Sequence, residues 1–132
     1  MIDFCKKQIQ SLGQFGEKTA ILYLKKIGYK LVCTNFTNLT GRRIGEIDII
    51  MKDKNELVFI EVKTRKKTLN QKTITPEENI GRQKLHKMEK IVNYYLKLKN
   101  LWDQPYRFDA VSLIYNEKTN QFKIKHIKNI FL

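Results

Sequence analysis

The chain has 132 residues, enough for one domain with a single core, and carries 26 lysines and arginines against 13 acidic residues. The net charge of +13 favours phosphate backbones or anionic membranes as partners. Its longest apolar runs are only about four residues, far below a membrane span, and the N-terminus lacks the order of a secretion signal. We therefore expect a single cytoplasmic domain over residues 1–132.

The first expected element is a helix from about Lys6 to about Ile27, because apolar residues recur along it close to a 3.6-residue period. Glu17 lies on the apolar stripe, so its carboxylate is predicted to point towards the core. Gly13 and Gly16 cost helix stability. Either another backbone or a bound phosphate comes close to the helix there, or the helix starts late and Gly13 belongs to a loop.

A strand is predicted next, over residues 30–36, with Cys33 as a buried, reduced thiol. The other cysteine, Cys5, is too distant in sequence for a C-x-x-C motif, and two cysteines are too few for a zinc site. Residues 37–43 are expected to form a loop that leads into a hairpin. With the two strands of this hairpin, the order is a helix and then three strands.

The hairpin contains the chain's densest set of chemically active side chains. A loop centred on residues 54 and 55 pairs positions whose numbers sum to 109, which places Asp48 opposite Glu61 and Glu46 opposite Lys63. Two carboxylates so close repel each other, and a divalent cation between them would turn that repulsion into a metal site. The alternative is a solvated polar face whose charges pair with cross-strand lysines. An odd-length loop would also separate the carboxylates.

Three features favour the metal site over the solvated face. Apolar Leu57 and Phe59 share the face of Glu61 by strand alternation, a basic segment follows the hairpin, and Glu17 points inward from the first helix. The residues expected to contact nucleic-acid phosphates are Arg42, Arg43, Arg65, Lys66, Lys67 and Lys72. Residues 65–75 have few apolar anchors and predict a mobile loop beside the site.

A second helix is predicted to begin at Thr75, an N-cap before Pro76 that completes a capping box with Glu78, and to end near Leu98. Its expected core-facing residues are Leu85, Met88, Val92, Tyr95 and Leu96. The lysines predicted to lean away from the core are Lys84, Lys87, Lys90 and Lys97. Strands over residues 106–115 and 122–127 complete the α/β order α-β-β-β-α-β-β.

Other candidate residues have structural explanations. His86 and His126 have no third histidine or serine motif beside them, so we expect structural or surface roles. Asp109 either supports the site from a neighbouring strand or forms a structural pair with Arg107. Trp102 and the tyrosines offer base stacking, although helix and strand periods place most of them in the core.

An ordered set of motifs along nearly the whole chain resembles the bacterial YraN-type family. The motifs are Phe15-Gly16-Glu17, Ala20, Tyr23-Leu24, Gly28-Tyr29, Asn35-Phe36, Gly45-Glu46-Ile47-Asp48, Val58-Phe59-Ile60-Glu61-Val62-Lys63-Thr64-Arg65, Arg107-Phe108-Asp109 and His126-Ile127-Lys128-Asn129-Ile130-Phe131. The resemblance implies a restriction-endonuclease-like fold of the PD-(D/E)xK superfamily, a mixed central sheet flanked by helices, closest in plan to archaeal Holliday junction resolvases. The site residues that it implies are Glu17, Asp48, Glu61 and Lys63.

The chain departs from the family pattern at two places. It lacks a proline before Asp48, and it has Gly81-Arg82-Gln83-Lys84 where relatives often carry a Lys-Gln pair in the second helix. The roles of Arg82 and Gln83 are therefore left open.

If the implied site forms, Asp48, Glu61 and the Val62 carbonyl would hold Mg²⁺ or Mn²⁺, and Glu17 would act through water or a second metal. Lys63 would orient the attacking water, help lower its pKa, or stabilise charge on the phosphate. We expect hydrolysis of phosphodiester bonds in nucleic acid, DNA before RNA, with structured or branched DNA as a candidate substrate. The alternatives are a nucleic-acid-binding module that cleaves nothing within a DNA-processing complex, and a basic scaffold protein. No membrane partner is expected, and a homodimer is left open.

Overall fold

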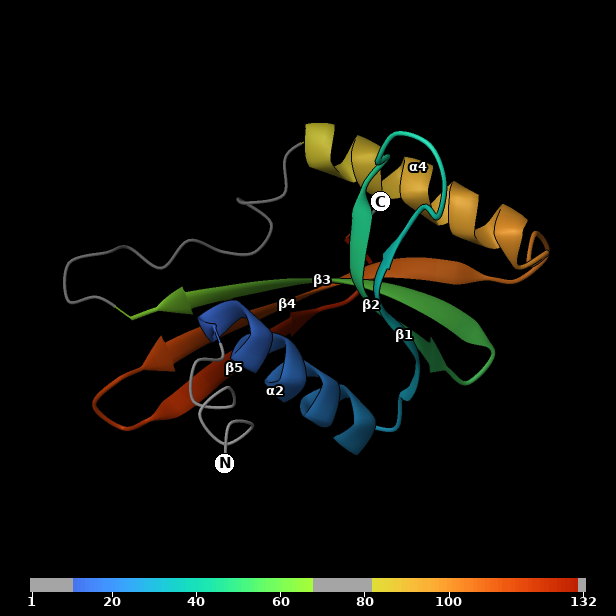
Figure 1. Cartoon of the computed structure of the whole chain (residues 1–132). Helices are drawn as coiled ribbons and strands as arrows, with labels where there is room; N and C mark the ends of the chain where they lie inside the picture. Colours follow the sequence, from blue (N-terminus) through green and yellow to red (C-terminus); the bar gives the residue numbers. More distant parts are fainter. Residues whose placement is uncertain (1–10, 68–81, 131–132) are drawn as a thin grey trace, which may run out of the picture.

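The structure is a computed structural model that describes residues 11–67 and 82–130, and within them it contains one five-stranded sheet between two helices (Figure 1). The elements are α2 (Leu12–Lys26), β1 (Lys30–Thr37), β2 (Glu46–Asp53), β3 (Glu56–Lys66), α4 (Arg82–Leu98), β4 (Tyr106–Asn116) and β5 (Gln121–Ile127). This succession confirms the predicted order α-β-β-β-α-β-β. Neither helix in these ranges is long and apolar enough to cross a membrane.

The sheet is mixed because one connection crosses over. Strands follow the spatial order β1-β2-β3-β4-β5, with antiparallel neighbours except for the parallel pair β3 and β4. A parallel pair needs a long connection, and α4 lies within it and covers one face of the sheet. Helix α2 covers the other face, so each face has its own core (Figure 1).

The two cores follow the alternation of side chains along β3. Phe59 packs with Met88 and Ile91 on the α4 side, whereas Val58 and Ile60 pack with Leu24 on the α2 side. Each such side chain, when fully buried, contributes about 1.5–3 kcal/mol to folding. The paired cores therefore fix β3 firmly, and β3 carries Glu61 and Lys63.

Helix α2 begins later than predicted. Ser11 has an extended backbone, its side-chain oxygen accepts the Gln14 N–H at 3.1 Å, and the Gln14 side chain accepts the Ser11 N–H at 3.2 Å. This capping box starts the helix at Leu12, which confirms the alternative of a late helix start and rules out a helix that continues from Lys6 through Ser11. Residues 6–10 themselves lie outside the described residues. Gly13 lies inside the first turn, which rules out its assignment to a loop.

The hairpin register is confirmed. The ladder runs from the pair Ile49–Ile60 to the pair Asp53–Glu56, and the residue numbers of every pair sum to 109. In the turn between the strands, Lys54 has a φ of 56°. The paired positions end at Ile49 and Ile60, one residue short of Asp48 and Glu61. The predicted pairing of Glu46 with Lys63 therefore lies beyond the ladder.

Strand β3 is longer than predicted and continues to Lys66. Arg65 pairs with Ile114 and Lys66 with Tyr115 of β4, so the predicted loop does not start at residue 65. Residues 68–75 of that loop, including the predicted helix start at Thr75, lie outside the described residues. The buried residues of α4 are Met88, Ile91, Val92, Tyr95 and Leu96, with Leu85 partly buried.

A partly buried polar network ties the hairpin turn to β4. Arg107 donates to Asp53 at 3.1 Å, to Glu56 at 2.6 Å and to Asp109 at 3.0 Å. Asp109 is fully buried, and although burial alone would raise its pKa, hydrogen bonds from His126, Arg107 and a backbone N–H lower the pKa below its ordinary value. The Arg107–Asp109 pair is therefore structural.

Several other predicted positions have clear outcomes. His126 is structural because it contacts Asp109 at 2.8 Å, whereas His86 is exposed on α4. Cys33 is a free thiol in β1 and is half-buried rather than buried. Trp102 is 59% exposed in the connection after α4, so it lies outside the core.

Candidate metal and phosphate site

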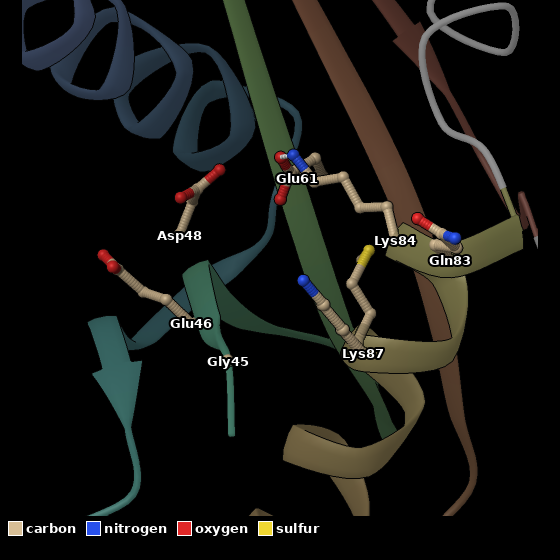
Figure 2. A pocket seen from close by; sticks show the side chains of 8 residues that line it. Gly45, Glu46, Asp48, Glu61, Gln83, Lys84 and Lys87 are labelled. Carbon is tan, nitrogen blue, oxygen red and sulfur yellow. Dashed lines mark ion pairs between the residues drawn. The ribbon is translucent and has the colours of Figure 1, made fainter. Parts of the chain in front are cut away.

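A pocket of 590 Å³ lies between the sheet and the first half of α4 (Figure 2). It is lined by Gly45, Glu46, Asp48, Glu61, Gln83, Lys84, Lys87 and Met88. The carboxylates come from β2 and β3, and the ammonium groups come from α4. The pocket therefore has an acidic wall and a basic wall.

Asp48 takes its position where the β2–β3 ladder stops. Its Oδ2 atom accepts the Val62 N–H at 2.8 Å, so a side chain replaces the next backbone pairing. Strand β2 is irregular at this point, because Ile47 and Ile50 both belong to the α4-side core while Ile49 belongs to the other core. This local irregularity frees Asp48 from the ladder and lets its carboxylate line the pocket.

The structure brings Asp48 and Glu61 together. Burial foremost, and then the charge of Glu61, raise the pKa of Asp48 to about 7, against the opposing hydrogen bond from Val62. A hydrogen bond between the two carboxyl groups, which needs a proton on one of them, raises the pKa of Asp48 further. The pair therefore behaves as the predicted like-charge pair at close range.

Glu61 is buried and holds two ammonium groups. Lys84 of α4 forms an ion pair with its Oε1 atom, and the Lys63 ammonium lies 3.8 Å from the same atom. The neighbouring Lys84, followed by partial burial, lowers the pKa of Lys63. Lys63 thus lies beside the carboxylate pair as predicted.

The prediction that Lys84 leans away from the core is wrong. Lys84 lies four residues before the buried Met88 and eight before the buried Val92, so it belongs to their stripe. That stripe reaches the polar pocket at the first turns of α4, where the stripe carries an ammonium group instead of an apolar side chain. Sequence reasoning missed Lys84, although the i, i+4, i+8 spacing was a usable signal. Gln83 also lines the pocket.

Glu17 approaches the site from α2 but does not line the pocket. Burial raises its pKa foremost, a hydrogen bond from the Asn35 side chain opposes this, and the charges of Glu46 and Glu61 raise it further. Glu17 is therefore electrostatically coupled to the carboxylate pair. Asn35 has a φ of 52° within β1, a left-handed backbone that asparagine tolerates better than most residues.

The glycine before Glu17 allows α2 to approach the sheet. A Cβ atom on Gly16 would collide with the Thr64 side chain of β3, including its Cγ2 atom at 2.9 Å and its Cβ atom at 3.0 Å. Gly16 is also buried. The close approach anticipated at this glycine is thus to a strand side chain, and it brings Glu17 towards the site.

The carboxylate pair fits a divalent cation held partly by water. Among residues 11–67 and 82–130, no group of three or more His, Cys, Asp and Glu side chains is placed to hold a metal ion. Mg²⁺ commonly binds one or two protein carboxylates and keeps several waters or substrate oxygens. Asp48 and Glu61 supply two such carboxylates, and their combined negative charge attracts a cation. The fit is therefore to a two-carboxylate site and not to a closed protein cage.

The predicted phosphate-contacting residues lie in several places. Arg43 forms an ion pair with Glu46 at 2.5 Å, and Lys66 forms one with Glu117 at 2.9 Å, both on exposed surface. Arg42 and Lys67 are exposed, and Arg65 is half-buried near the end of β3. Lys72 and the side chain of Arg82 lie outside the described part of the chain. The pocket itself presents Lys84 and Lys87 instead.

Comparison with known proteins places the site within a matched segment. The model of the family described as "Uncharacterised protein family UPF0102" matches residues 16–113, which include Glu17, Asp48, Glu61, Lys63 and Lys84. A UPF0102 protein of Clostridium botulinum strain Hall is 40% identical over 129 residues, covering 97% of each chain. A UPF0102 protein of Caldicellulosiruptor saccharolyticus is 36% identical over 122 residues, covering 92% of this chain and 98% of its own.

Proposed function

The chain belongs to the UPF0102 family, and from the geometry of its pocket we propose that it is a metal-dependent nuclease of the restriction-endonuclease-like PD-(D/E)xK superfamily. The proposed reaction is hydrolysis of phosphodiester bonds in nucleic acid, with DNA preferred. One observation carries the proposal: Asp48 and Glu61 share a pocket despite their repulsion, with Lys63 beside them.

This arrangement is hard to explain as a binding surface alone. A protein that only holds a polyanion gains from lysines and arginines, whereas buried carboxylates repel phosphate and cost free energy to ionise. Asp48 bears that cost, since its pKa is raised to about 7. Groups held against such a cost are commonly found at functional sites. The acidic wall therefore supports chemistry in addition to binding.

In the proposed mechanism, Asp48 and Glu61 would hold Mg²⁺ or Mn²⁺. When bound, the cation supplies Lewis-acid polarisation of a phosphoryl oxygen and lowers the pKa of a water molecule. Glu17 adds negative charge from α2 that strengthens the attraction for the cation. The carbonyl of Val62 stays a proposed further ligand.

Lys63 is the residue proposed to act on the reacting groups. Its ammonium lies 3.8 Å from Glu61, so it can donate a hydrogen bond to a water or phosphate oxygen beside the carboxylate pair. Hydrolysis requires a water oxygen to lose a proton and the leaving oxygen to gain one. The neighbouring Lys84 lowers the pKa of Lys63, so Lys63 gives up a proton more readily than an isolated lysine does.

A non-cleaving nucleic-acid-binding module is the second candidate function. The observation that favours it is the ion pair between Lys84 and Glu61, which neutralises the carboxylate without any metal. In that case the pocket's lysines would contact phosphate and the carboxylates would serve the fold. The net charge of +13 suits either function.

A cleavage assay separates the two functions. Single-stranded, duplex, flap and four-way junction substrates, as DNA and RNA, are incubated with the full chain and Mg²⁺ or Mn²⁺. We expect cleavage of at least one substrate, reduced by roughly 10²-fold or more in Lys63→Ala with binding retained. Lys52→Ala, a change at an exposed site elsewhere on the hairpin, is the matched control and should cleave as the wild type does. Binding without cleavage would favour the second function, and full cleavage by Lys63→Ala would contradict the mechanism.

A further inference from the structure

The basic wall of the pocket makes direct contact with the acidic wall at one point. Lys84 reaches from α4 to Oε1 of Glu61 (Figure 2). Lys63 lies 3.8 Å from that same oxygen. The Glu61 side chain is 7% exposed, whereas that of Lys84 is 37% exposed. The contact thus joins a buried acceptor to a donor that is open to the pocket.

Glu61 needs a positive partner whenever it is ionised. A buried carboxylate without a counter-ion costs several kcal/mol, so some cation must compensate its charge. In the structure, Lys84 provides this charge directly, and Lys63 lies further away. A divalent cation bound by Asp48 and Glu61 would take over the same task, and the Lys84 ammonium would then meet a like charge.

Of the two partners in this ion pair, Lys84 is the one able to move. Glu61 is fixed in the middle of β3, where it pairs with Ala110 of the neighbouring strand. Lys84 has a flexible four-carbon stem and opens onto a pocket of 590 Å³. Lys87, three residues further along α4, lines the same pocket, so a released Lys84 ammonium would lie beside a second one.

We propose that Lys84 is a positioning residue that competes with the divalent cation for Glu61, and that its release creates a phosphate-binding position together with Lys87. Two ammonium groups facing a cation across the pocket form the charge pattern that recognises a phosphate group. The phosphate part rests on the proposed function, whereas the competition for Glu61 concerns the cation alone.

The proposal predicts effects of opposite sign from one substitution. Removing the Lys84 charge removes the competitor, so cation binding should become tighter. The same change removes half of the phosphate position, so nucleic-acid binding in the presence of the cation should become weaker. A residue that only stabilises the fold would not produce this opposition.

The test measures Mn²⁺ affinity of the full chain by titration calorimetry. Lys84→Met keeps the length of the stem, and we expect it to bind Mn²⁺ roughly fivefold more tightly than the wild type, as loss of a competing ion pair implies. In Lys84→Arg, the arginine side chain can donate two hydrogen bonds to one carboxylate, so this variant should bind Mn²⁺ more weakly than the wild type. Lys87→Met is the matched control, since Lys87 lines the same wall, and it should change the affinity less than Lys84→Met does. Affinity for a phosphorothioate oligonucleotide, measured with Mn²⁺ present, should fall in both methionine variants.

Each outcome has one meaning. The proposal is overturned if Lys84→Met binds Mn²⁺ no more tightly than Lys87→Met, or if neither it nor the wild type binds Mn²⁺ at all. Mn²⁺ binding that follows the expected order in a protein that cleaves no nucleic acid would refute the nuclease function and leave the competition for Glu61 standing. Circular dichroism melting checks that each variant is folded, and the opposite effect of Lys84→Arg provides an independent comparison if Lys84→Met is unstable.

Discussion

At the scale of single residues, the chemistry of the site comes from a carboxylate placed where backbone pairing stops. Asp48 accepts the Val62 N–H with one carboxylate oxygen, while Glu61, its neighbour on the same wall of the pocket, is buried and paired with lysine. Burial and the charge of Glu61 then raise the pKa of Asp48 to about 7. This pKa links the free energy of unfolding to pH.

The linkage predicts that the Asp48 carboxylate destabilises the metal-free protein above neutral pH. Its pKa rises from 3.8 in the unfolded chain to about 7 in the folded chain, so the folded state binds the proton more strongly. The free energy by which protonated Asp48 stabilises the fold is fully present below pH 3.8 and is lost as the pH rises through about 7. Asp48→Asn lacks this titration and keeps an acceptor for the Val62 N–H. We compare the unfolding free energy of Asp48→Asn with that of the wild type at each pH. This difference should be about 2–4 kcal/mol larger, in favour of the variant, at pH 8 than at pH 4.

Urea denaturation at a series of pH values, with a chelator present, measures this difference. Asp103→Asn, a change at an exposed residue after α4, serves as the control and should follow the wild type. A gap between Asp48→Asn and the wild type that stays constant from pH 4 to pH 8 would show that Asp48 does not titrate as proposed.

At the scale of elements, the site depends on how closely α2 packs on β3. We predict that Gly16→Ala destabilises the protein by about 1–3 kcal/mol, because the added methyl group collides with Thr64 and no rotation of that side chain clears its Cβ atom. The sign is informative, since alanine is otherwise favoured over glycine in a helix by about 1 kcal/mol. Urea denaturation measures the change.

The same helix offers a matched control for this prediction. A Cβ atom on Gly13 would meet only the Ser11 hydroxyl oxygen, at 3.9 Å, so Gly13→Ala should be neutral or slightly stabilising. Thr64→Ala should recover part of the loss in a double variant with Gly16→Ala. Equal effects of the two glycine substitutions would argue against the close approach of α2 to β3.

The elements also show which features the sequence could predict. The hairpin register follows from a two-residue turn and local alternation, and the pairing of Ile49 with Ile60 confirms it. The apolar period extended the first helix back to Lys6, because this period does not register the capping box of Ser11 and Gln14 that starts α2 at Leu12. The i, i+4, i+8 spacing could have placed Lys84 on the buried stripe of α4, but its contact with Glu61 depends on how α4 docks on the sheet, which no local pattern determines. The polar network around Arg107 is of the same kind.

At the scale of the whole molecule, much of the negative charge is already paired within the fold. Arg107 binds two carboxylates of the hairpin turn, Glu117 is paired with Lys66, and Glu61 with Lys84. The chain carries 13 more positive than negative charges. Most lysines and arginines among the described residues are exposed. Such a molecule is attracted to any polyanion, and what distinguishes one face from another is which charges touch phosphate.

The basic segment at the end of β3 is our proposed contact with the nucleic-acid backbone. Each phosphate neutralised by the protein releases counterions, so log K falls with log salt concentration at a slope near −0.9 per contact on duplex DNA. Replacing Arg65, Lys66 and Lys67 together by alanine should flatten that slope by up to about three units and weaken binding to all sequences alike. Because Lys66 is held by Glu117 at 2.9 Å, a change nearer two units would mean that this ion pair persists in the complex.

A control with the same loss of charge shows whether position or net charge is responsible. Alanine at the exposed Lys25, Lys26 and Lys30, near the end of α2, also lowers the net charge from +13 to +10. Fluorescence anisotropy with a labelled duplex, across a range of salt concentrations, compares the two triple variants. We expect the control to keep the wild-type slope, because charges that do not touch phosphate release no counterions. Identical slopes in both variants would remove the β3 segment from the binding face and favour the lysines of α4, of which Lys84 and Lys87 already face the pocket.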